Sequence, residues 1–445
     1  MAIIKIKKIN LQNLRNVRQG EIVLAVNFET FLQANVVGLY GQNGSGKTTI
    51  VDAFSLLKTL LSGWLAEVKL PSQKKRLILA GEQTASLDVE FLVQNQFGTF
   101  FVNYYVELQE DQHRLYTTLE RLTYRENTKG KRSKILVAVT ERDVQIRQSK
   151  LDDLSEQARI QLLVIQQLAR KQYMSFLFHK DIKALLHERL SELEMQLLQN
   201  IAVDFSRDLH VVNTQNIAPL FEERMMPFSI HLEKTRGLIP YDLNGPALLP
   251  EDGFYALCEV IEQSNQVLSA IIPGLTIKIN IITKQMMDSG EQGIRFEFLS
   301  QRGEQELPLR TESEGILKII SILSVLIAVY NNPNACVVID ELDSGVFEYL
   351  LGELLTVIDE DGKGQLIFTS HNLRVLEVLA IKNLWFTTTN EHHRYMQLKG
   401  MKEVNNARDV YLRAIQLGGQ EEEIYKETKT FKIKRAFRKA GVQHD

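Results

Sequence analysis

The sequence has 445 residues, a formal net charge of −3 and two cysteines, Cys258 and Cys336. Its length allows roughly two to four domains with ample apolar core. The charge excludes a wholly basic nucleic-acid binder, although it still allows a local basic face. Two cysteines far apart in the chain exclude a disulfide framework and a cysteine-based metal site, as expected of a protein in the reducing cytoplasm.

No stretch of the sequence predicts a signal peptide or a membrane span. Residues 3–9 alternate lysine and isoleucine, which is typical of a strand and not of the unbroken apolar core of a signal peptide. The longest apolar run, Ile316–Tyr330, has 15 residues and contains Lys318, so it is too short to cross a bilayer. We therefore expect a cytoplasmic protein without a membrane partner.

The first 148 residues predict strands around one helix. Two strands, Ile3–Leu11 and Glu21–Phe28, flank a turn, and a short buried strand follows at Val36–Tyr40. A helix is expected from residue 47 to about Val68. Later segments rich in β-branched and aromatic residues predict a small antiparallel lobe with a hairpin turn at 95–98. Its expected strands are Ser86–Val93, Thr99–Leu108, Arg114–Tyr124 and Ile135–Thr140.

A glycine-rich loop with the pattern G-x-x-x-x-G-K-[ST] joins Val36–Tyr40 to the following helix. Its glycines allow positive φ, so that consecutive N–H groups can converge on phosphate oxygens at the positive end of the helix. Lys47 is expected to bridge the β- and γ-phosphates, and the Thr48 hydroxyl to hold Mg²⁺. The predicted phosphate-binding residues are Gly41, Gln42, Asn43, Gly44, Ser45, Gly46, Lys47, Thr48 and Thr49.

Two basic segments have two interpretations each. The loop 127–134 is either a solvated hairpin tip or a contact with a nucleic-acid backbone through Lys129, Lys131 and Arg132. The C-terminal tail is either an exposed terminal helix or a surface for nucleic acid or a partner protein. Aromatic residues interrupt its basic ones, which are Lys426, Lys429, Lys432, Lys434, Arg435, Arg438 and Lys439.

Residues 149–272 predict a mainly helical insertion. From Leu151 to about Asp208 glycine and proline are almost absent, and apolar residues recur every three or four positions. This period is typical of amphipathic helices, here in an antiparallel hairpin. Five prolines between residues 219 and 250 predict an irregular segment, which is followed by a helix at Gly253–Ile271.

Residues 273–400 predict alternating strands and helices. The apolar helix Ile316–Tyr330 has a defined start, because Thr311 and Glu314 fit a capping box. Two short apolar runs after it are typical of neighbouring buried parallel strands. The expected strands are Leu275–Ile282, Gly293–Leu299, Glu306–Leu309, Ala335–Glu341, Gln365–Thr369, Leu384–Thr388 and Arg394–Leu398, with a helix at Val346–Asp359.

Three polar residues follow the two buried parallel strands. Asp340 and Glu341 end the first strand, and His371 comes just after the second. Carboxyl ends of parallel strands meet at one sheet edge, so we expect these side chains beside the phosphate loop. Asp340 would order Mg²⁺, Glu341 would polarise a water, and His371 would contact the γ-phosphate or that water. Helix capping by the acids and a structural histidine are the alternatives.

Together these motifs resemble the ABC-type ATPase heads of the RecF, SMC and OLD group, which includes many stand-alone bacterial defence ATPases. The resemblance covers about residues 1–110 and 275–390. The signature lacks the family's second glycine. The matching segments are Gly41–Thr49 as Walker A, Ser313-Glu314-Gly315 as a degenerate signature, Val337–Glu341 as Walker B, Leu342-Asp343-Ser344-Gly345 as the D-loop and His371 as the switch histidine.

The resemblance implies an α/β fold, namely a P-loop ABC-type ATPase head with a mixed sheet and a small antiparallel β lobe, interrupted by a helical insertion. Arg15 would approach the nucleotide, and Gln83 is the candidate for the Q-loop. The 266 residues between Lys47 and Ser313 (313 − 47) leave room for an insertion that transporter ABC domains lack. The implied units are 1–148 with the β lobe, 149–272 as the insertion, 273–400 as the second half of the head and 401–445 as a helical basic tail.

The resemblance also implies ATP and Mg²⁺, and a homodimer or higher homo-oligomer with ATP at its interface. ATP on the Walker A loop of one copy would be covered by Ser313 and Gly315 of another, at a helix N-terminus that favours anions. Ordinary helix capping by Ser313 is the alternative. Glu341, Lys47 and His371 would be catalytic. Hydrolysis would remove the shared ligand and loosen the assembly; in the assembled state Asp343 would also lie near the nucleotide.

The task of the ATPase is open among three hypotheses. OLD-type proteins carry a TOPRIM nuclease after the head, but 74 residues follow His371 here (445 − 371), without an Asp-x-Asp strand end. We therefore expect a regulatory or sensor ATPase that controls a separately encoded effector, a nuclease, in anti-phage defence. A RecF-like protein that binds DNA in recombination and repair is the alternative. The spacing disfavours a transporter subunit.

His392 and His393 suggest a metal site, but adjacent histidines on a strand face opposite ways.

Overall fold

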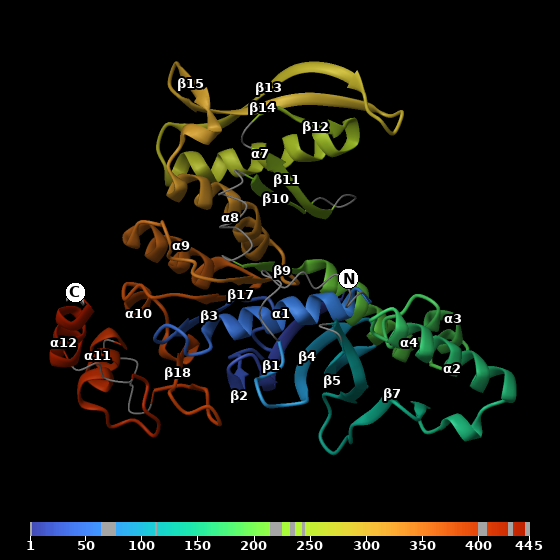
Figure 1. Ribbon diagram of the computed structural model, residues 1–445. Helices are drawn as coiled ribbons and strands as arrows, with labels where there is room; N and C mark the ends of the chain where they lie inside the picture. Colours follow the sequence, from blue (N-terminus) through green and yellow to red (C-terminus); the bar gives the residue numbers. More distant parts are fainter. Residues whose placement is uncertain are drawn as a thin grey trace, which may run out of the picture.

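The computed structural model describes residues 2–63, 77–111, 114–213, 225–231, 236–242, 245–398, 407–425 and 430–440, with the backbone alone at 225–231 and 236–242. It is an α/β protein in which sheets and helices alternate in layers (Figure 1). A six-stranded mixed sheet lies in the middle, a seven-stranded antiparallel sheet lies below it in this view, and a four-stranded sheet forms an upper lobe. The predicted α/β class is confirmed.

The central sheet has the strand order β19-β18-β3-β17-β16-β9, and its strands are parallel except for β19. Its predicted strands are found, and β9 is an addition: the helical segment ends at Asp208, and the next four residues pair with β16. The strands are β3 (Asn35–Tyr40), β9 (Leu209–Val212), β16 (Cys336–Ile339), β17 (Gln365–Thr369), β18 (Leu384–Thr387) and β19 (Tyr395–Met396).

The central sheet is covered on both faces. In β3, Val37 and Leu39 join the apolar core that contains helix α1 (Lys47–Leu61), while Val36 and Tyr40 join the core of helices α8 (Glu314–Asn331) and α9 (Glu348–Asp361). This alternation follows from the period of two in a strand. Because both faces are buried, the parallel strands are continuous apolar runs in the sequence.

The antiparallel sheet has the order β2-β1-β4-β5-β6-β7-β8. It is larger than the small lobe predicted, because the N-terminal strand β1 pairs with both β2 and β4 and so extends the sheet to seven strands. The predicted hairpin turn at 95–98 joins β4 to β5. The strands are β1 (Ile3–Leu14), β2 (Val17–Val23), β4 (Thr84–Asn95), β5 (Gly98–Asp111), β6 (Arg114–Glu126), β7 (Lys134–Thr140) and β8 (Val144–Ile146).

Residues 151–208 are helical, as predicted, but they do not form a hairpin of two long helices. Tyr173 adopts φ 54° just after the first helix, and the chain continues in shorter helices beside the antiparallel sheet (Figure 1). The segments are a 3₁₀ turn at Leu151–Asp153, α2 (Glu156–Lys171), α3 (Ile182–His187), α4 (Glu192–Gln199), a π-helical turn at Asn200–Phe205 and α5 (Ser206–Asp208).

The upper lobe packs helix α7 against the four-stranded sheet. Phe254 and Leu257 of α7 share one apolar core with Ile277, Phe296 and Phe298 of the sheet. A separate hairpin, β10 with β11, lies between this lobe and the central sheet (Figure 1). The elements are β10 (Met225–His231), β11 (Arg236–Asp242), β12 (Ala247–Pro250), α7 (Glu251–Ile271), β13 (Leu275–Met286), β14 (Gln292–Arg302) and β15 (Gln305–Pro308).

Helix α8 begins later than the predicted capping box implies. Residues Leu309–Thr311 form a 3₁₀ turn in which the Thr311 hydroxyl donates to the Pro308 carbonyl. Ser313 is therefore the N-cap, and its hydroxyl accepts from the Ile316 N–H at 3.4 Å. With 18 residues, α8 is long and apolar enough to cross a membrane, unlike the shorter run predicted, but two thirds of it (67%) is buried inside the protein.

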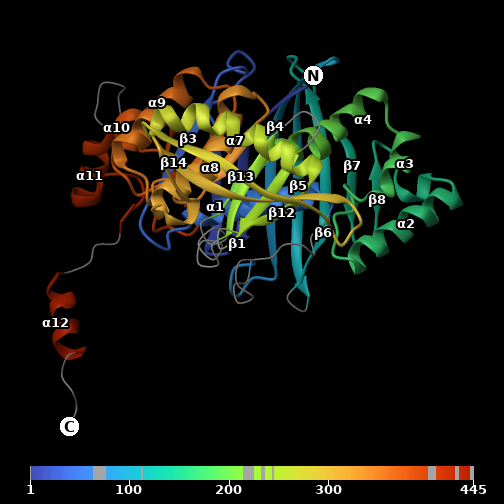
Figure 2. The same cartoon turned by 90° about the horizontal axis from the view of Figure 1, so that it is seen from above.

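The C-terminal region contains α10 (Val375–Val378), a 3₁₀ turn at Ile381–Asn383, α11 (Ala407–Leu417) and α12 (Thr430–Ala440). No residue of α12 is buried, and Figure 2 shows this helix apart from the body. Helix α1 ends at Leu61 with Ser62 as its C-cap, so the predicted end near Val68 is wrong. The tail residues Lys426 and Lys429 lie outside the described residues. The four sequence units remain a proposed division of the chain.

Candidate nucleotide-binding site

A pocket of about 560 Å³ opens at the carboxyl edge of the central sheet. Its volume falls in the range of about 300–1,000 Å³ that is typical of small-ligand sites. It brings together most of the predicted site residues from four separate segments of the chain. Its lining residues are Arg15, Asn16, Asn43, Gly44, Gly46, Lys47, Thr48, Thr49, Ile78, Ala80, Asp340, Glu341 and His371.

The phosphate loop has the conformation that its glycines predict. Gly44 and Gly46 adopt φ of 76° and 98°, which residues with a Cβ rarely tolerate. Helix α1 begins at Lys47, so its N-terminus opens at the pocket. The Lys47 ammonium donates to the carbonyls of Gly41 at 2.7 Å and Gln42 at 3.1 Å. Burial lowers the pKa of Lys47, against the opposing effect of Asp340 and other nearby carboxylates.

Thr48 and Asp340 meet across the pocket. The Thr48 hydroxyl lies 3.5 Å from Asp340 Oδ1, and the Thr369 hydroxyl donates to the same oxygen at 2.6 Å. Two adjacent ligands of an octahedral Mg²⁺, each about 2.1 Å from the ion, lie about 3 Å apart. A hydroxyl and a carboxylate at this separation therefore fit Mg²⁺ with a small adjustment.

Glu341 is held in an unusual backbone conformation. Its φ is 48°, in the left-handed region, although it is not glycine. Its N–H donates to the Thr369 hydroxyl at 2.7 Å. Its carbonyl accepts from the Lys318 ammonium at 2.5 Å and from the Ser344 N–H at 3.0 Å. Such a conformation persists only where its surroundings fix it, and here both sides of the residue are fixed.

His371 lines the pocket from the end of β17. Its backbone N–H donates to Asp343 Oδ2 at 3.0 Å, which links the predicted switch histidine to the predicted D-loop. Burial, together with the nearby Lys47 ammonium, lowers the pKa of His371, while three carboxylates act in the opposite direction. The imidazole is therefore neutral at pH 7 and able to accept a hydrogen bond.

Four residues that contact the phosphate loop or support such a contact were not predicted. The Asn16 amide donates to the Gly44 carbonyl at 2.6 Å, and the Tyr395 hydroxyl donates to the Gly46 carbonyl at 2.8 Å. Thr387 Oγ1 lies 2.5 Å from Ser45 Oγ, and Arg394 donates to the Asn16 carbonyl at 3.1 Å. For the three of these residues within 384–398, the sequence offered one signal, namely the predicted pair of strands there. A strand that pairs with β3 in parallel ends beside the phosphate loop, so its last residues can contact that loop.

Arg15 lines the pocket in the turn between β1 and β2, with φ 52°. Its Nε lies 2.6 Å from Asp52 Oδ2, so α1 holds its guanidinium. Gln83 is exposed and does not line the pocket, whereas Ile78 and Ala80 of the same segment do.

The remaining predicted residues lie outside the pocket. Ser45 turns away from it, because its hydroxyl donates to the Gln42 carbonyl at 2.6 Å. Ser313 is exposed at the start of α8, and Gly315 packs against the D-loop of the same chain. A Cβ on Gly315 would lie 2.2 Å from the Gly345 carbonyl oxygen, so this approach requires glycine.

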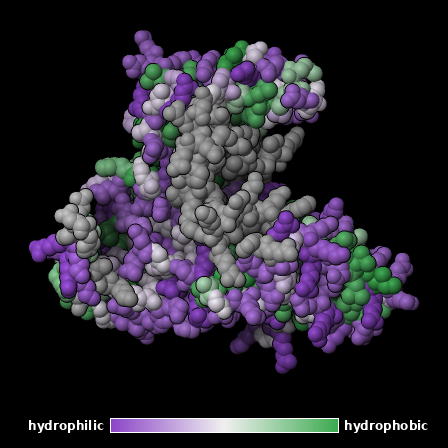
Figure 3. Space-filling view, viewed as in Figure 1, coloured by the Kyte–Doolittle hydropathy of each residue, from purple (hydrophilic) through white to green (hydrophobic). Residues whose placement is uncertain are grey.

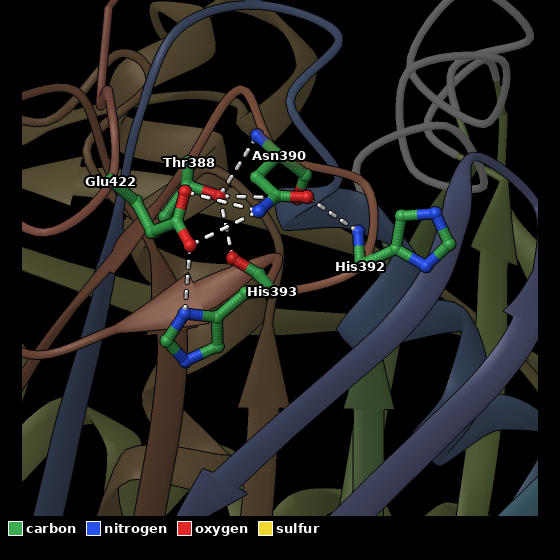
Figure 4. Close-up of polar contacts among 5 residues, drawn as sticks. All are labelled: Thr388, Asn390, His392, His393 and Glu422. Atoms are coloured by element: carbon green, nitrogen blue, oxygen red, sulfur yellow. Dashed lines mark hydrogen bonds and ion pairs between the residues drawn. The ribbon is translucent and has the colours of Figure 1, made fainter.

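His392 and His393 do not form a metal site. Figure 4 shows the two rings pointing apart. His393 Nδ1 lies 3.4 Å from Glu422 Oε1, and Asn390 donates to both oxygens of the same carboxylate at 3.0 Å. Within the described part of the chain, no group of three His, Cys, Asp or Glu side chains is placed to hold a metal ion. These contacts instead fasten the C-terminal segment to the β18–β19 hairpin.

The sequence matches the model of a protein family described as "AAA domain, putative AbiEii toxin, Type IV TA system" over residues 36–377. The chain belongs to this family. The matched residues include the phosphate loop, helix α8 and the acidic end of β16. With the geometry of the pocket, the match confirms the predicted ABC-type ATPase head. No curated protein matches the chain in sequence.

Solved heads of SMC proteins are similar to this chain at low identity. An SMC head bound to the C-winged helix domain of ScpA shares 13% identity with a TM-score of 0.44, covering 88% of this chain and 98% of that one. An SMC head domain from Thermotoga maritima shares 15%, with a TM-score of 0.39 and coverage of 89% and 99%. An SMC head with a coiled coil and joint from Pyrococcus yayanosii shares 12%, with a TM-score of 0.41 and coverage of 93% and 100%.

Proposed function

We propose that the protein hydrolyses ATP to ADP and phosphate, and that ATP-dependent assembly of two or more copies controls a separately encoded effector, a nuclease, in cytoplasmic anti-phage defence. The observation that carries the proposal is the convergence of Lys47, Thr48, Asp340, Glu341 and His371 on one pocket. This set contains a cation for phosphates, two metal ligands, a carboxylate for a water and a neutral histidine.

Each residue has a defined part in this proposal. Lys47 leaves the carbonyls of its own loop and binds the phosphates, beside the N-terminus of α1. Thr48 and Asp340 would hold Mg²⁺, which supplies positive charge to the phosphate oxygens. Glu341 accepts a proton from the attacking water. His371, kept neutral by its surroundings, accepts a hydrogen bond from that water or contacts the γ-phosphate.

The position of Ser313 supports assembly. The N-terminus of α8 is exposed, lies off the pocket of its own chain and belongs to a helix of 18 residues. A helix N-terminus favours anions, so this one suits the γ-phosphate bound by a second copy. In that arrangement each pocket is complete only when two copies meet, and hydrolysis removes the ligand that joins them.

An exposed apolar stripe on α2 supports a protein partner. Ile160, Val164 and Leu168 are four residues apart and expose 54%, 52% and 38% of their surface. Figure 3 shows apolar surface on this side of the molecule, over the helical segment. Grouped apolar residues on a surface are typical of interaction sites. The family description, which names a toxin of a type IV TA system, supports a defence role.

The deciding experiment compares Glu341→Gln with Lys47→Ala. Glu341→Gln should bind ATP but hydrolyse it at least about a hundredfold more slowly, because it lacks the carboxylate that takes the water proton. With ATP and Mg²⁺ it should therefore accumulate as a larger assembly in light scattering. Lys47→Ala should fail to bind ATP and stay at the mass of the nucleotide-free protein.

Equal masses for the two variants, with and without ATP, would overturn assembly as the output of the ATPase. Absence of ATP hydrolysis by the wild-type protein would overturn the enzymatic part. For the effector, co-purification from the native host should yield a nuclease whose activity changes with Glu341→Gln. An unchanged nuclease activity would contradict regulation through this site.

The second candidate is a RecF-like protein that binds DNA. Helix α12 favours it, since its exposed surface carries Lys432, Lys434, Arg435, Arg438 and Lys439. It predicts ATP-dependent binding of duplex DNA by the purified protein alone, with a steep dependence on salt. Neutralising this helix or the loop 127–134 should abolish the binding. Duplex binding that ignores ATP would count against this alternative.

A further inference from the structure

Lys318 is a buried charge that the proposed chemistry does not yet use. It lies in the second turn of α8, and only 7% of its surface is exposed. Apart from Glu314 at the N-terminus, it is the only charged residue of this apolar helix. Burying an ammonium is costly unless it is paired and hydrogen-bonded. Its place in the core therefore requires a hydrogen-bond partner that offsets the free energy of desolvation.

The partner is the backbone of Glu341. The Lys318 ammonium donates to the Glu341 carbonyl at 2.5 Å, while the Thr369 hydroxyl accepts from the Glu341 N–H at 2.7 Å. Burial lowers the pKa of Lys318, and the carboxylates of Asp343, Glu341 and Asp340 oppose this. The ammonium thus faces the acidic loop, residues 340–345, of which Asp340 and Glu341 line the pocket.

Besides apolar packing against Leu342, two contacts join α8 to the backbone of this acidic loop. One is the Lys318 hydrogen bond, and the other is the approach of Gly315 to the Gly345 carbonyl, one turn earlier in the helix. Glu341, the residue that Lys318 contacts, is the one that adopts the left-handed conformation. Figure 1 shows α8 reaching from the upper lobe to the central sheet, so the upper lobe and the loop are joined by one rigid element.

We propose that Lys318 is a positioning residue for Glu341, which holds the backbone of this residue in its left-handed conformation and so keeps its carboxylate at the pocket. This inference deepens the proposed ATPase and rests on it. A second copy that presses on the N-terminus of α8 would act on Glu341 through Lys318. Lys318 thereby couples assembly to hydrolysis without touching the nucleotide.

The test uses Lys318→Met, Lys318→Arg and Lys58→Met in the full-length protein. Lys58 is the matched control, because its ammonium also donates to a main-chain carbonyl, that of Leu209 at 2.8 Å, and it does not line the pocket. Lys318→Met should lower kcat at least tenfold while KM and the affinity for ATP stay within twofold. Lys318→Arg should restore part of kcat, and Lys58→Met should leave it unchanged.

A second readout does not depend on ATP. Hydrogen exchange of the amides in 341–346 should become at least tenfold faster in Lys318→Met and stay unchanged in Lys58→Met, since only the former removes the ammonium that donates to the Glu341 carbonyl. Unchanged exchange there, or a KM effect without a kcat effect, would overturn the role of Lys318. A wild-type protein that fails to hydrolyse ATP would overturn the proposed function, and hydrogen exchange would still decide the role of Lys318.

Discussion

The polar residues at the two ends of the central sheet differ in their surroundings. At the amino end, Gln365 and Asn334 are buried and their side-chain amides pair with the backbone of β1. The Gln365 amide exchanges two hydrogen bonds with Ile6, and Asn334 Oδ1 accepts from the Ile4 N–H. At the carboxyl end, Lys47, Asp340, Glu341 and His371 line an open pocket.

The difference shows that polar residues at one end of a sheet can stabilise the fold while those at the other end remain available to a ligand. Polar groups at the amino end find all their partners inside the chain, so they fasten β1 to the central sheet without a ligand. At the carboxyl end the N-terminus of α1 opens at the pocket, and a helix N-terminus favours anions such as phosphates. Substitutions at the two ends should therefore change different measured quantities.

The largest effect should come from Gln365→Leu, compared with Thr369→Val at the other end of the same strand. Gln365→Leu leaves the buried N–H and carbonyl of Ile6 unpaired, which should lower the free energy of unfolding by about 2–3 kcal/mol. Its affinity for ATP should not change. Thr369→Val removes the hydroxyl that holds Asp340 and Glu341, so it should mainly slow hydrolysis. Urea unfolding measures the stability of each variant, and steady-state kinetics measures its hydrolysis rate. If the two variants lose equal stability and equal rate, the two ends of the sheet do not differ as proposed.

A second effect of about 2–3 kcal/mol should appear as a pH dependence at the amino end. Burial lowers the pKa of Lys5 from 10.5 to about 8, although its ammonium donates to the carbonyls of Gln33 and Lys363. Between these two pKa values the unfolded chain keeps a proton that the folded chain has lost, so stability rises with pH. From pH 7 to pH 10, wild type should gain about 2–3 kcal/mol relative to Lys5→Met. If the free energies of unfolding of wild type and Lys5→Met, measured in urea, change with pH in parallel, the prediction is contradicted.

The smallest effect is expected at the carboxyl end, behind the phosphate loop. Tyr395→Phe removes the hydrogen bond to the Gly46 carbonyl and should weaken ATP binding by about 1 kcal/mol, or about fivefold. Tyr104→Phe is its control, because the Tyr104 hydroxyl donates to buried Glu120 in the antiparallel sheet at 2.8 Å. Calorimetric titration with ATP should show weaker binding only for Tyr395→Phe. The same loss in both variants would mean a general effect of loosened packing.

The site could be predicted where residues close in sequence determine it. The glycine loop, Lys47 and Thr48 follow one another, so their local pattern carries the chemistry. Asp340, Glu341 and His371 could be added because each follows an apolar run, and parallel strands end at one edge. The antiparallel pairs near residues 95–98 and 384–398 could be predicted for the same reason, since turn residues separate strand-like runs.

Only the tertiary structure decided which distant residues support that site. Strand β9 has four residues, too few for a periodic signal, and it exists because β16 offers a free edge. Lys318 looked like an interruption in an apolar run until the fold placed the Glu341 carbonyl beside it. Thr387 and Tyr395 reach the phosphate loop across some 350 residues. The sequence by itself determined the candidate phosphate site because short-range spacing encodes it, whereas tertiary packing decided which distant side chains support it.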